Sequence, residues 1–394
     1  MSKPTGSTEW ASDSTALKAD PSSDQRAYGW STSDNTINGV PVKPNLQQQN
    51  GWQKNVHDWV SYLDGQNDEL QEVAPAIAQS LVANDWTNLR NWTNMNSPNE
   101  SYTWTNCIWS NVAQKFVAVA EENINPIASS ANGYLYNTIP LPNVYPVALA
   151  ENDSILLCAG GGGVYTSTDG DNWTARTSAS SEGWWRGAWG SDTFVIVAQY
   201  QLDSSNQVQT SPDGITWTGR GNLPNCAVLY DVVYSEYYGR FFAVGAVLTG
   251  TAQNCIWSSS DSSSWVQEPV GTITGATPYT SLNSIAIDEN GVIVISSDSN
   301  IWRSPDYDLN FTALEFDLFF RTPTYTQLKY IPEIGRWLVV SLDGSVYSST
   351  DSEYWISTGP NDNTASLRCC DYSPVLGMWF LVSGGGTQRF WRSL

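Results

Sequence analysis

Ser167-Thr168-Asp169-Gly170-Asp171-Asn172-Trp173 is the stretch that decides the fold of this chain. It follows a short apolar run and precedes a polar one, which is typical of a turn between two β-strands. An aspartate side chain accepts hydrogen bonds from backbone N–H groups two or three residues further on, and glycine adopts a positive φ without strain. The stretch is therefore predicted to be a structural turn, against which the closing tryptophan packs.

The same turn recurs along the chain at a regular distance. One further copy is complete and three keep the aspartate and a closing aromatic residue: Ser211, Asp213, Gly214 and Trp217; Ser259, Asp261 and Trp265; Ser304, Asp306 and Phe311; Ser349, Asp351 and Trp355. With Trp92 and Tyr136 included, the closing aromatic residues are separated by 44, 37, 44, 48, 46 and 44 positions. A period of about 40–50 residues is the sequence signature of a β-propeller.

Each repeat is predicted to hold four short strands, and the second strand is an apolar run in all seven repeats. The last repeat shows only three strands before Leu394, whereas residues 85–93 have the sequence of a turn and an outer strand. Joining the two would close the ring without an exposed sheet edge. The sequence therefore predicts a mainly β fold, a seven-bladed β-propeller over residues 85–394 closed by an N-terminal strand. Six blades are the alternative, because Tyr136 is the weakest marker.

The segment before the repeats differs from them in character. Residues 1–49 are polar, lack the apolar content of a core, and are expected to form an extended arm. Residues 50–84 carry apolar side chains at helical spacing and are predicted to form two short α-helices as a connector. The helices could pair locally, bundle in a homotrimer or dock as a plug, and the sequence leaves these alternatives open.

Composition argues against several classes of partner. Lys and Arg total 18 against 39 Asp and Glu, a net charge of −21, which argues against nucleic acid and anionic membrane surfaces. Soluble proteins, neutral glycans, or acidic glycans bridged by cations remain. No apolar run reaches the roughly 18 residues of a membrane-spanning helix, and the N-terminus resembles no secretory signal, so synthesis in a cytoplasm without a signal peptide is expected. The six cysteines show no metal or disulfide spacing and are predicted to be buried thiols.

The Ser-x-Asp-Gly-x-x-Trp pattern of residues 167–173 and 211–217 resembles the Asp-box of a large group of propellers that includes sialidases, lectins and sorting receptors. It is one residue shorter than their usual motif, because the glycine follows the aspartate directly. The resemblance covers residues 85–394 and implies the propeller fold. It says little about function, because one fold hosts many activities.

Short stretches before the repeats form a second pattern: Thr8-Glu-Trp10-Ala-Ser-Asp13, Gly29-Trp30, Pro44, Gln49-Asn50-Gly-Trp52 and Asp58-Trp59-Val-Ser-Tyr62-Leu63. Residues 8–64 thereby resemble the N-terminal attachment regions of tailed-bacteriophage tail fibre and tailspike proteins. In that family such a segment anchors the protein to the virion tail, and a distal module meets the host. The resemblance implies a viral protein of the virion tail, in which the attachment residues are Trp10, Trp30, Trp52, Trp59, Tyr62 and Leu63.

Histidine content argues against most kinds of catalytic site. His57 is the only histidine and lies before the repeats, so histidine-activated nucleophiles and histidine-bound metals are not expected. Glycoside hydrolysis needs only two carboxylates, and polysaccharide cleavage stays an alternative. A sialidase-like site would need three converging arginines, for which the candidates are Arg186, Arg240, Arg303, Arg321 and Arg368. No cofactor is predicted, and structural calcium at Asp-rich turns such as residues 169–171 is an alternative.

Ligand binding is the favoured function. In a propeller, the loops between strands two and three and between successive repeats gather on one face around the axis, opposite the repeated turns. Aromatic faces beside polar groups would suit sugar rings, which have C–H patches edged by hydroxyl groups. The candidate ligand-binding residues are Trp184, Trp185, Arg186, Tyr200, Asp203, Tyr279, Phe319, Phe320, Arg321 and Tyr325. Alternatively, the phenylalanine pair packs between blades and the tryptophan pair covers a blade seam.

These features together predict a tail fibre or receptor-binding protein of a phage virion, whose propeller binds a glycan or receptor on the host surface. The arm and helices would contact other tail proteins. A structural adaptor on which other tail proteins dock is the alternative, and a polysaccharide-cleaving glycoside hydrolase is a further one.

Overall fold

A computed structural model of the chain divides it into two units, Met1–Thr87 and Asn88–Leu394. In the second unit the structure describes residues 92–95, 97–122, 126–141, 144–200, 206–248, 255–270, 273–274, 281–297, 300–314, 324–360, 365–385 and 389–393. In the first it describes only β1 (Thr36–Ile37) and β2 (Val40–Pro41), an antiparallel pair. The predicted helices and the attachment residues Trp10, Trp30, Trp52, Trp59, Tyr62 and Leu63 lie outside the described residues.

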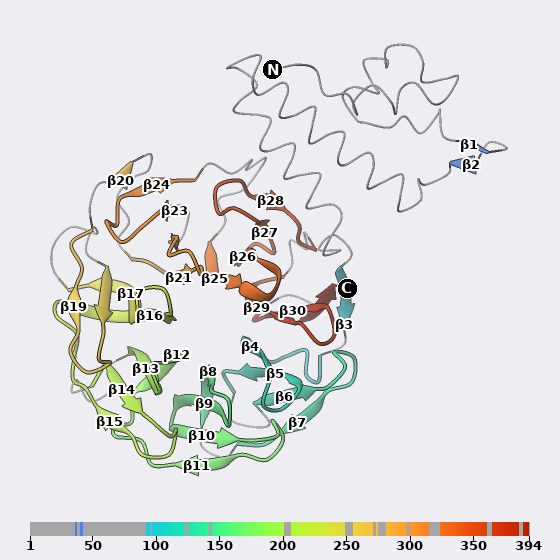
Figure 1. The fold of residues 1–394 in the computed structure, drawn as a ribbon. Helices are drawn as coiled ribbons and strands as arrows, with labels where there is room; N and C mark the ends of the chain where they lie inside the picture. Colours follow the sequence, from blue (N-terminus) through green and yellow to red (C-terminus); the bar gives the residue numbers. More distant parts are fainter. Residues whose placement is uncertain are drawn as a thin grey trace, which may run out of the picture. The chain divides into compact units, whose positions relative to one another are not determined.

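The second unit is a ring of seven sheets around a central axis (Figure 1). Within each blade the strands that follow one another in sequence pair antiparallel, and the innermost strand comes first. From the axis outward, blade 1 consists of β4 (Trp104–Ser110), β5 (Lys115–Ala120), β6 (Ile127–Ser130) and β7 (Asn137–Ile139), and blade 2 consists of β8 (Tyr145–Glu151), β9 (Leu156–Gly161), β10 (Gly163–Ser167) and β11 (Thr174–Arg176). Blade 3 consists of β12 (Gly183–Gly190), β13 (Thr193–Tyr200), β14 (Val208–Ser211) and β15 (Thr218–Gly219). Blade 4 consists of β16 (Cys226–Ser235), β17 (Arg240–Val247), β18 (Ile256–Ser259) and β19 (Val266–Gln267).

The remaining three blades are built in the same way, except that the outermost strand of blade 7 comes from the start of the propeller sequence and blade 5 has one additional strand. Blade 5 is β21 (Ser284–Ile287), β22 (Ile293–Ser296), β23 (Ile301–Ser304) and β24 (Phe311–Ala313); blade 6 is β25 (Tyr325–Ile331), β26 (Arg336–Ser341), β27 (Val346–Ser349) and β28 (Ile356–Ser357); blade 7 is β29 (Leu367–Ser373), β30 (Met378–Ser383), β31 (Phe390–Ser393) and β3 (Trp92–Met95). The addition is β20 (Ile273–Thr274), which pairs in parallel with β24 at the outer edge of blade 5. The part of the chain that the structure describes contains no helix that could span a membrane.

Blade 7 joins the two ends of the propeller sequence. β3 pairs antiparallel with β31, with Trp92 opposite Ser393 and Met95 opposite Phe390. The indole nitrogen of Trp92 also donates a 2.7 Å hydrogen bond to the carbonyl oxygen of Thr358, next to blade 6. The prediction of seven blades closed by an N-terminal strand is therefore confirmed, and the six-bladed alternative is wrong.

The hydrophobic core lies in the seams between neighbouring blades. In the cluster between blades 7 and 1, for example, the ring centres of Trp104 and Phe390 lie 4.8 Å apart, and those of Phe116 and Phe380 lie 5.0 Å apart. The largest side chains in these seams are six almost fully buried tryptophans, namely Trp104, Trp184, Trp257, Trp302, Trp337 and Trp379. Such rings bury a large area, so the high tryptophan content serves packing between sheets. All six cysteines are buried and free, as predicted.

The repeated turn is stabilised by hydrogen bonds from its own backbone. In blade 2 the carboxylate of Asp169 accepts the N–H groups two and three residues further on, at 2.9 and 2.7 Å. Ser167 Oγ accepts the N–H of Gly170 at 2.9 Å, and the indole nitrogen of Trp173 donates to the Gly170 carbonyl oxygen at 3.1 Å. The aspartate contacts recur in three other copies, around Asp213, Asp261 and Asp351.

Two departures from the motif keep the same turn. In two of the three copies that lack glycine, Ser262 and Ser352 adopt positive φ values of 60° and 65° at that position. In blade 1, Asn132 replaces the aspartate and accepts two backbone N–H groups at 2.9 and 3.0 Å, while Tyr136 donates to the Gly133 carbonyl oxygen at 2.9 Å. Tyr136 therefore closes a full copy of the turn, although its sequence makes it the weakest marker.

Acid is expected to weaken the aspartate turns. Backbone N–H groups, that of Ser264 first, hold the pKa of Asp261 below its ordinary value. The stability that this carboxylate contributes is therefore complete above about pH 4, its unfolded value, and is lost as the pH falls through the lower folded value. Asp261→Asn, the residue that blade 1 uses, should cost at most about 0.5 kcal/mol at pH 7, because Asp261 is exposed. In thermal unfolding the difference from wild type should shrink below pH 4, and a difference that stays constant down to pH 2 would contradict this.

Candidate functional site

The innermost strands carry β-bulges, which direct side chains toward the axis of the ring. In six of the seven innermost strands, the pairing with the second strand skips a residue, which leaves a β-bulge, and β16 has two such bulges. The skipped residues are Thr105, Val147, Trp185, Ala227, Tyr230, Thr326 and Arg368. Because the extra residue of a bulge is left unpaired and its side chain is re-aimed, these positions can turn toward the axis.

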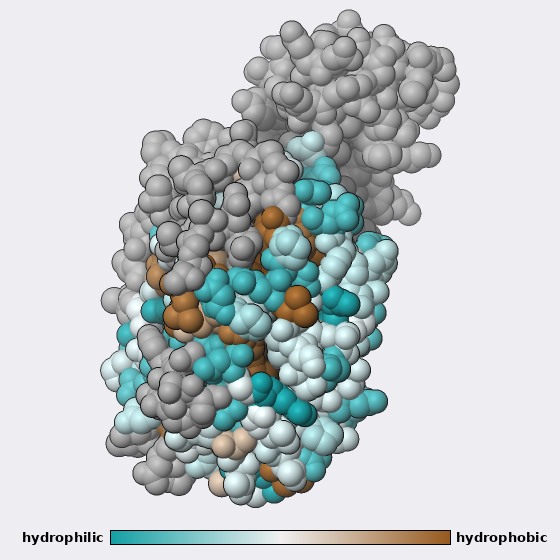
Figure 2. Space-filling view, turned by 90° about the vertical axis from the view of Figure 1, so that its left-hand side faces the viewer, coloured by the Kyte–Doolittle hydropathy of each residue, from teal (hydrophilic) through white to brown (hydrophobic). Residues whose placement is uncertain are grey.

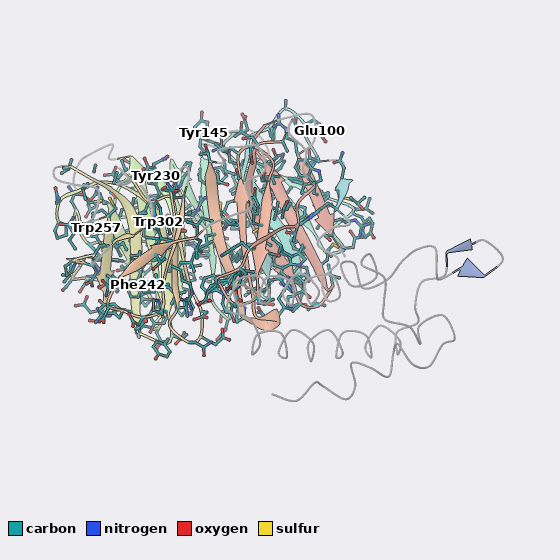
Figure 3. All side chains as sticks on the ribbon, turned by 90° about the horizontal axis from the view of Figure 1, so that it is seen from above. Glu100, Tyr145, Tyr230, Phe242, Trp257 and Trp302 are labelled. Atoms are coloured by element: carbon teal, nitrogen blue, oxygen red, sulfur yellow. The ribbon has the colours of Figure 1, made fainter. Side chains whose placement is uncertain are left out.

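A cavity of about 250 Å³ lies on the axis at this level. It is lined by Thr105, Trp185, Arg186, Tyr230, Ser281, Asn283, Thr324, Thr326, Leu342 and Arg368, which come from every blade except blade 2. Five of the seven bulge residues are among them. Seen from the side of the ring, Tyr230 lies toward the face that carries Glu100 and Tyr145, whereas Phe242 lies toward the other face (Figure 3). The cavity therefore opens where the innermost strands begin, and the repeated turns lie at the opposite ends of the blades.

The structure separates the three adjacent candidates of β12. Trp185 and Arg186 line the cavity, and the guanidinium carbon of Arg186 lies 5.3 Å from the centre of the Trp185 ring. Trp184 does not reach the cavity: it is 1% exposed and packs between blades 2 and 3 with residues such as Phe194 and Ala148. Its placement as a ligand-binding residue is therefore corrected. The reason is the β-bulge at Trp185, which re-aims the side chain of the extra residue while Trp184 stays on the side of the seam.

The other candidates are described only in part. Tyr200 and Tyr325 belong to β13 and β25, of which the backbone is described at these positions. Asp203, Tyr279, Phe319, Phe320 and Arg321 lie outside the described residues. Sequence reasoning did not select Thr105, Tyr230 and Thr326 for the site, and it considered Arg368 only as an arginine of a sialidase-like site.

Two arginines give the cavity a positive wall. Arg186 is 9% exposed, and its Nη1 donates a 3.0 Å hydrogen bond to the carbonyl oxygen of Trp185. Burial lowers the pKa of Arg368, the carboxylate of Glu121 opposes that shift, and the charge of Arg186 lowers it further. Burial also raises the pKa of Asp231, an effect that the charge of Arg186 opposes. Arg186 and Arg368 thus both contribute positive charge to the lining of the cavity.

A buried ion pair lies on the same innermost strands, further along them than the cavity residues. Lys329 Nζ in β25 lies 2.6 Å from Asp371 Oδ1 in β29. Asp371 also accepts the N–H of Trp109 in β4 at 2.8 Å and that of Tyr372 at 2.9 Å, so it ties blades 6, 7 and 1 together. Burial alone would lower the pKa of Lys329, but the carboxylate of Asp371 raises it above the ordinary value. This pair supports the ring where its two ends meet.

The other charged groups considered for chemistry have structural partners. Arg240 lies with Glu268 and Tyr307, and Arg303 lies 3.3 Å from Glu353, so neither joins Arg186 and Arg368 at the cavity. In the turn considered for calcium, the Asp171 carboxylate contacts Lys115 Nζ and Ser129 Oγ at 2.5 Å each. Across the described ranges no three His, Cys, Asp or Glu side chains gather as metal ligands would.

Comparison with known proteins identifies the architecture. No protein-family model and no curated protein sequence matches the chain. Among solved structures, a streptogramin B lyase is similar with a TM-score of 0.60 and 9% identity, over 77% of this chain and 97% of the lyase. A catalytically inactive virginiamycin B lyase from Staphylococcus aureus, solved with quinupristin, gives 0.62 and 9%, over 77% and 99%.

A third solved structure matches the same share of the chain. YCF48 from Cyanidioschyzon merolae gives a TM-score of 0.56 and 13% identity, over 77% of this chain and 98% of that protein. At such low identity these likenesses concern the fold alone, because propellers with unrelated functions share it. The chain is thus similar to nearly the whole of a lyase and of YCF48, and it is a seven-bladed β-propeller.

Proposed function

We propose that the propeller is a glycan-binding module and that the axial cavity is its binding site. The observation that carries this proposal is the lining: Trp185 and Tyr230 offer ring faces beside hydroxyl, amide and guanidinium groups from six blades. Sugar recognition needs this combination of apolar patches and convergent polar groups. A cavity of about 250 Å³ is small compared with drug-sized sites of about 300–1,000 Å³, which suits one or two sugar units.

The hydroxyl groups of Thr105 and Thr326 can accept hydrogen bonds from a ligand in the cavity. Thr326 Oγ1 donates to the carbonyl oxygen of Leu367 at 2.9 Å, and Thr105 Oγ1 donates to that of Val119 at 3.3 Å. Since each hydroxyl proton already has a partner, the free lone pairs of these oxygens can accept hydrogen bonds from sugar hydroxyl groups. This supports a ligand rich in O–H donors.

Hydrolysis has less support than binding. A glycosidase needs two carboxylates about 5–10 Å apart across its cleft. None of the ten described residues that line the cavity is an aspartate or glutamate. The lyases with a similar fold share only 9% identity with this chain and give no direct guide to its activity. We therefore favour binding without cleavage.

The biological setting that we propose is a virion tail appendage, anchored by the N-terminal segment. The support is the resemblance of residues 8–64 to tail fibre attachment regions. A structural adaptor would need a docking surface instead. In the view of Figure 2, described hydrophobic residues form small separate spots among hydrophilic ones, and a stable interface usually has a more continuous apolar centre. This favours the axial cavity, and not the side of the ring seen in Figure 2, as the functional surface.

Trp185→Ala is expected to lower the affinity for the cognate glycan at least about tenfold, because it removes the ring face against which a sugar would pack. The measurement is binding of the full-length protein and its variants to an array of bacterial surface glycans. Tyr237→Ala is the matched control, since Tyr237 is 60% exposed and lies outside the cavity. Equal binding by wild type and Trp185→Ala would contradict the assignment of the site. Release of shorter saccharides during the assay would support the hydrolase instead.

A further inference from the structure

Neither arginine of the axial cavity is paired directly with a described carboxylate. Four ion pairs are found among the described side chains, and neither Arg186 nor Arg368 takes part in one. The Nε of Arg368 is buried and has no hydrogen-bond partner among the described residues. Holding two guanidinium groups near each other in a partly buried site is unfavourable unless an anion joins them. Neither guanidinium group therefore has a directly bound carboxylate among the described residues, although the charges of Glu121 and Asp231 interact with Arg368 and Arg186.

The backbone makes room for this arrangement. Arg368 is the extra residue of the β29 bulge, so its side chain leaves the sheet toward the cavity. Gly384, after β30, allows the chain to pass beside it: a Cβ added there would lie 2.9 Å from Arg368 Nε and 3.3 Å from its Cγ. Arg186 is oriented by its hydrogen bond to Trp185 and by the ring that it contacts. Both guanidinium groups are thus positioned before any ligand arrives.

Resting on the proposed glycan-binding function, we infer that the axial cavity binds an acidic saccharide through its carboxylate, which Arg186 and Arg368 hold directly. Guanidinium forks match carboxylates geometrically and bind them by paired hydrogen bonds. The sugar ring then packs on Trp185 or Tyr230, and its hydroxyl groups donate to Thr105 and Thr326. No bridging cation is required, although the chain as a whole is acidic, because the local charge of the lining is positive.

A chemical comparison on the unmodified protein gives the first test. Full-length protein is titrated calorimetrically with tetrasaccharides that contain galacturonate, glucuronate or sialic acid, and with the methyl ester of each. An ester keeps the sugar and removes only the charge. We expect at least one acid to bind, at least tenfold more tightly than its ester, and to bind equally well in the presence of EDTA.

Matched arginine variants give the second test. Arg368→Met should lower the affinity for the acid at least tenfold and leave that for the ester almost unchanged. Arg368→Lys should lie between them, because it keeps the charge and loses the fork. Arg220→Met is the control: it removes the same charge at a residue that donates to Thr210 and lies outside the cavity. Thermal unfolding of each variant checks that it is folded; should Arg368→Met fail to fold, the comparison of acids with esters still decides.

The results that would contradict the proposal distinguish a failure of the arginine–carboxylate contact from a failure of glycan binding. Equal affinity for acids and esters would overturn the charge assignment and leave glycan binding intact. Loss of binding in EDTA would replace the arginine contact by a bridging cation. Binding of inorganic phosphate or an acidic peptide, with no saccharide bound, would overturn both proposals, and so would an absence of binding by every probe.

Discussion

Asp371→Asn is expected to destabilise the propeller by about 3 kcal/mol, the lower end of the range for breaking a buried ion pair. Asp371 is 5% exposed, and all three of its recorded partners donate to it: Lys329 Nζ and the backbone N–H groups of Trp109 and Tyr372. An asparagine removes the charge that pairs with Lys329, and its amide nitrogen would face one of these donors. Part of the Lys329 side chain, 30%, remains exposed, so water moderates the loss.

The matched control is Glu353→Gln, the same carboxylate-to-amide change in an exposed pair. Glu353 lies 3.3 Å from Arg303 and is 53% exposed, so its replacement should change the free energy of unfolding by less than about 0.5 kcal/mol. Denaturant unfolding at pH 7 measures both. Comparable losses for the two variants would show that the link between blades 6, 7 and 1 contributes no more than a surface pair.

Gly160→Ala is expected to cost about 3 kcal/mol or more, beyond the usual range for overpacking of about 1–3 kcal/mol. A Cβ on Gly160 in β9 would lie 1.9 Å from the carbonyl oxygen of Tyr145 and 2.7 Å from the Cα of Pro146. Both atoms belong to the backbone of β8 beside its bulge, so no side-chain rotation can relieve the overlap. Blade 4 has the same arrangement, where a Cβ on Gly245 would meet the carbonyl oxygen of Val228 at 2.0 Å.

The adjacent residue provides the control for this prediction. Gly161 also lies in β9, its φ is outside the left-handed region, and an added Cβ would meet no atom within 4 Å. Gly161→Ala should therefore be neutral or slightly stabilising, because alanine lowers the entropy of the unfolded chain. Thermal and denaturant unfolding of the two single variants compare them directly. If both behave alike, the bulge of β8 is not the tight contact described above.

The fold was predictable because the residues that form the turn of each repeat lie close together in the sequence. The aspartate, glycine and tryptophan of residues 167–173 act through hydrogen bonds within seven residues, so the sequence displays them locally. Ring closure could be inferred from a missing strand at one end and a surplus strand at the other. Blade 1 was the weak point, because Asn132 and Tyr136 perform the same hydrogen bonding with different residue types.

The site was less predictable because bulges decide which side chains reach the axis. Trp184 and Trp185 look alike in the sequence, yet one fills a seam and the other lines the cavity. A signal does exist in hindsight: in five of the innermost strands, a bulge residue stands four positions before an aromatic residue near the end of the strand. The pairs are Thr105 and Trp109, Trp185 and Trp189, Tyr230 and Tyr234, Thr326 and Tyr330, and Arg368 and Tyr372. Reading that spacing down the repeats would have placed Tyr230 and Arg368 beside Trp185.

A crystal structure of the full-length protein with its best-binding acidic tetrasaccharide tests the central claim most directly. The account predicts one sugar unit in the axial cavity, with its ring against Trp185 or Tyr230 and its carboxylate on Arg186 and Arg368. A saccharide bound at the outer strands or at the repeated turns, with the cavity unoccupied, would contradict it.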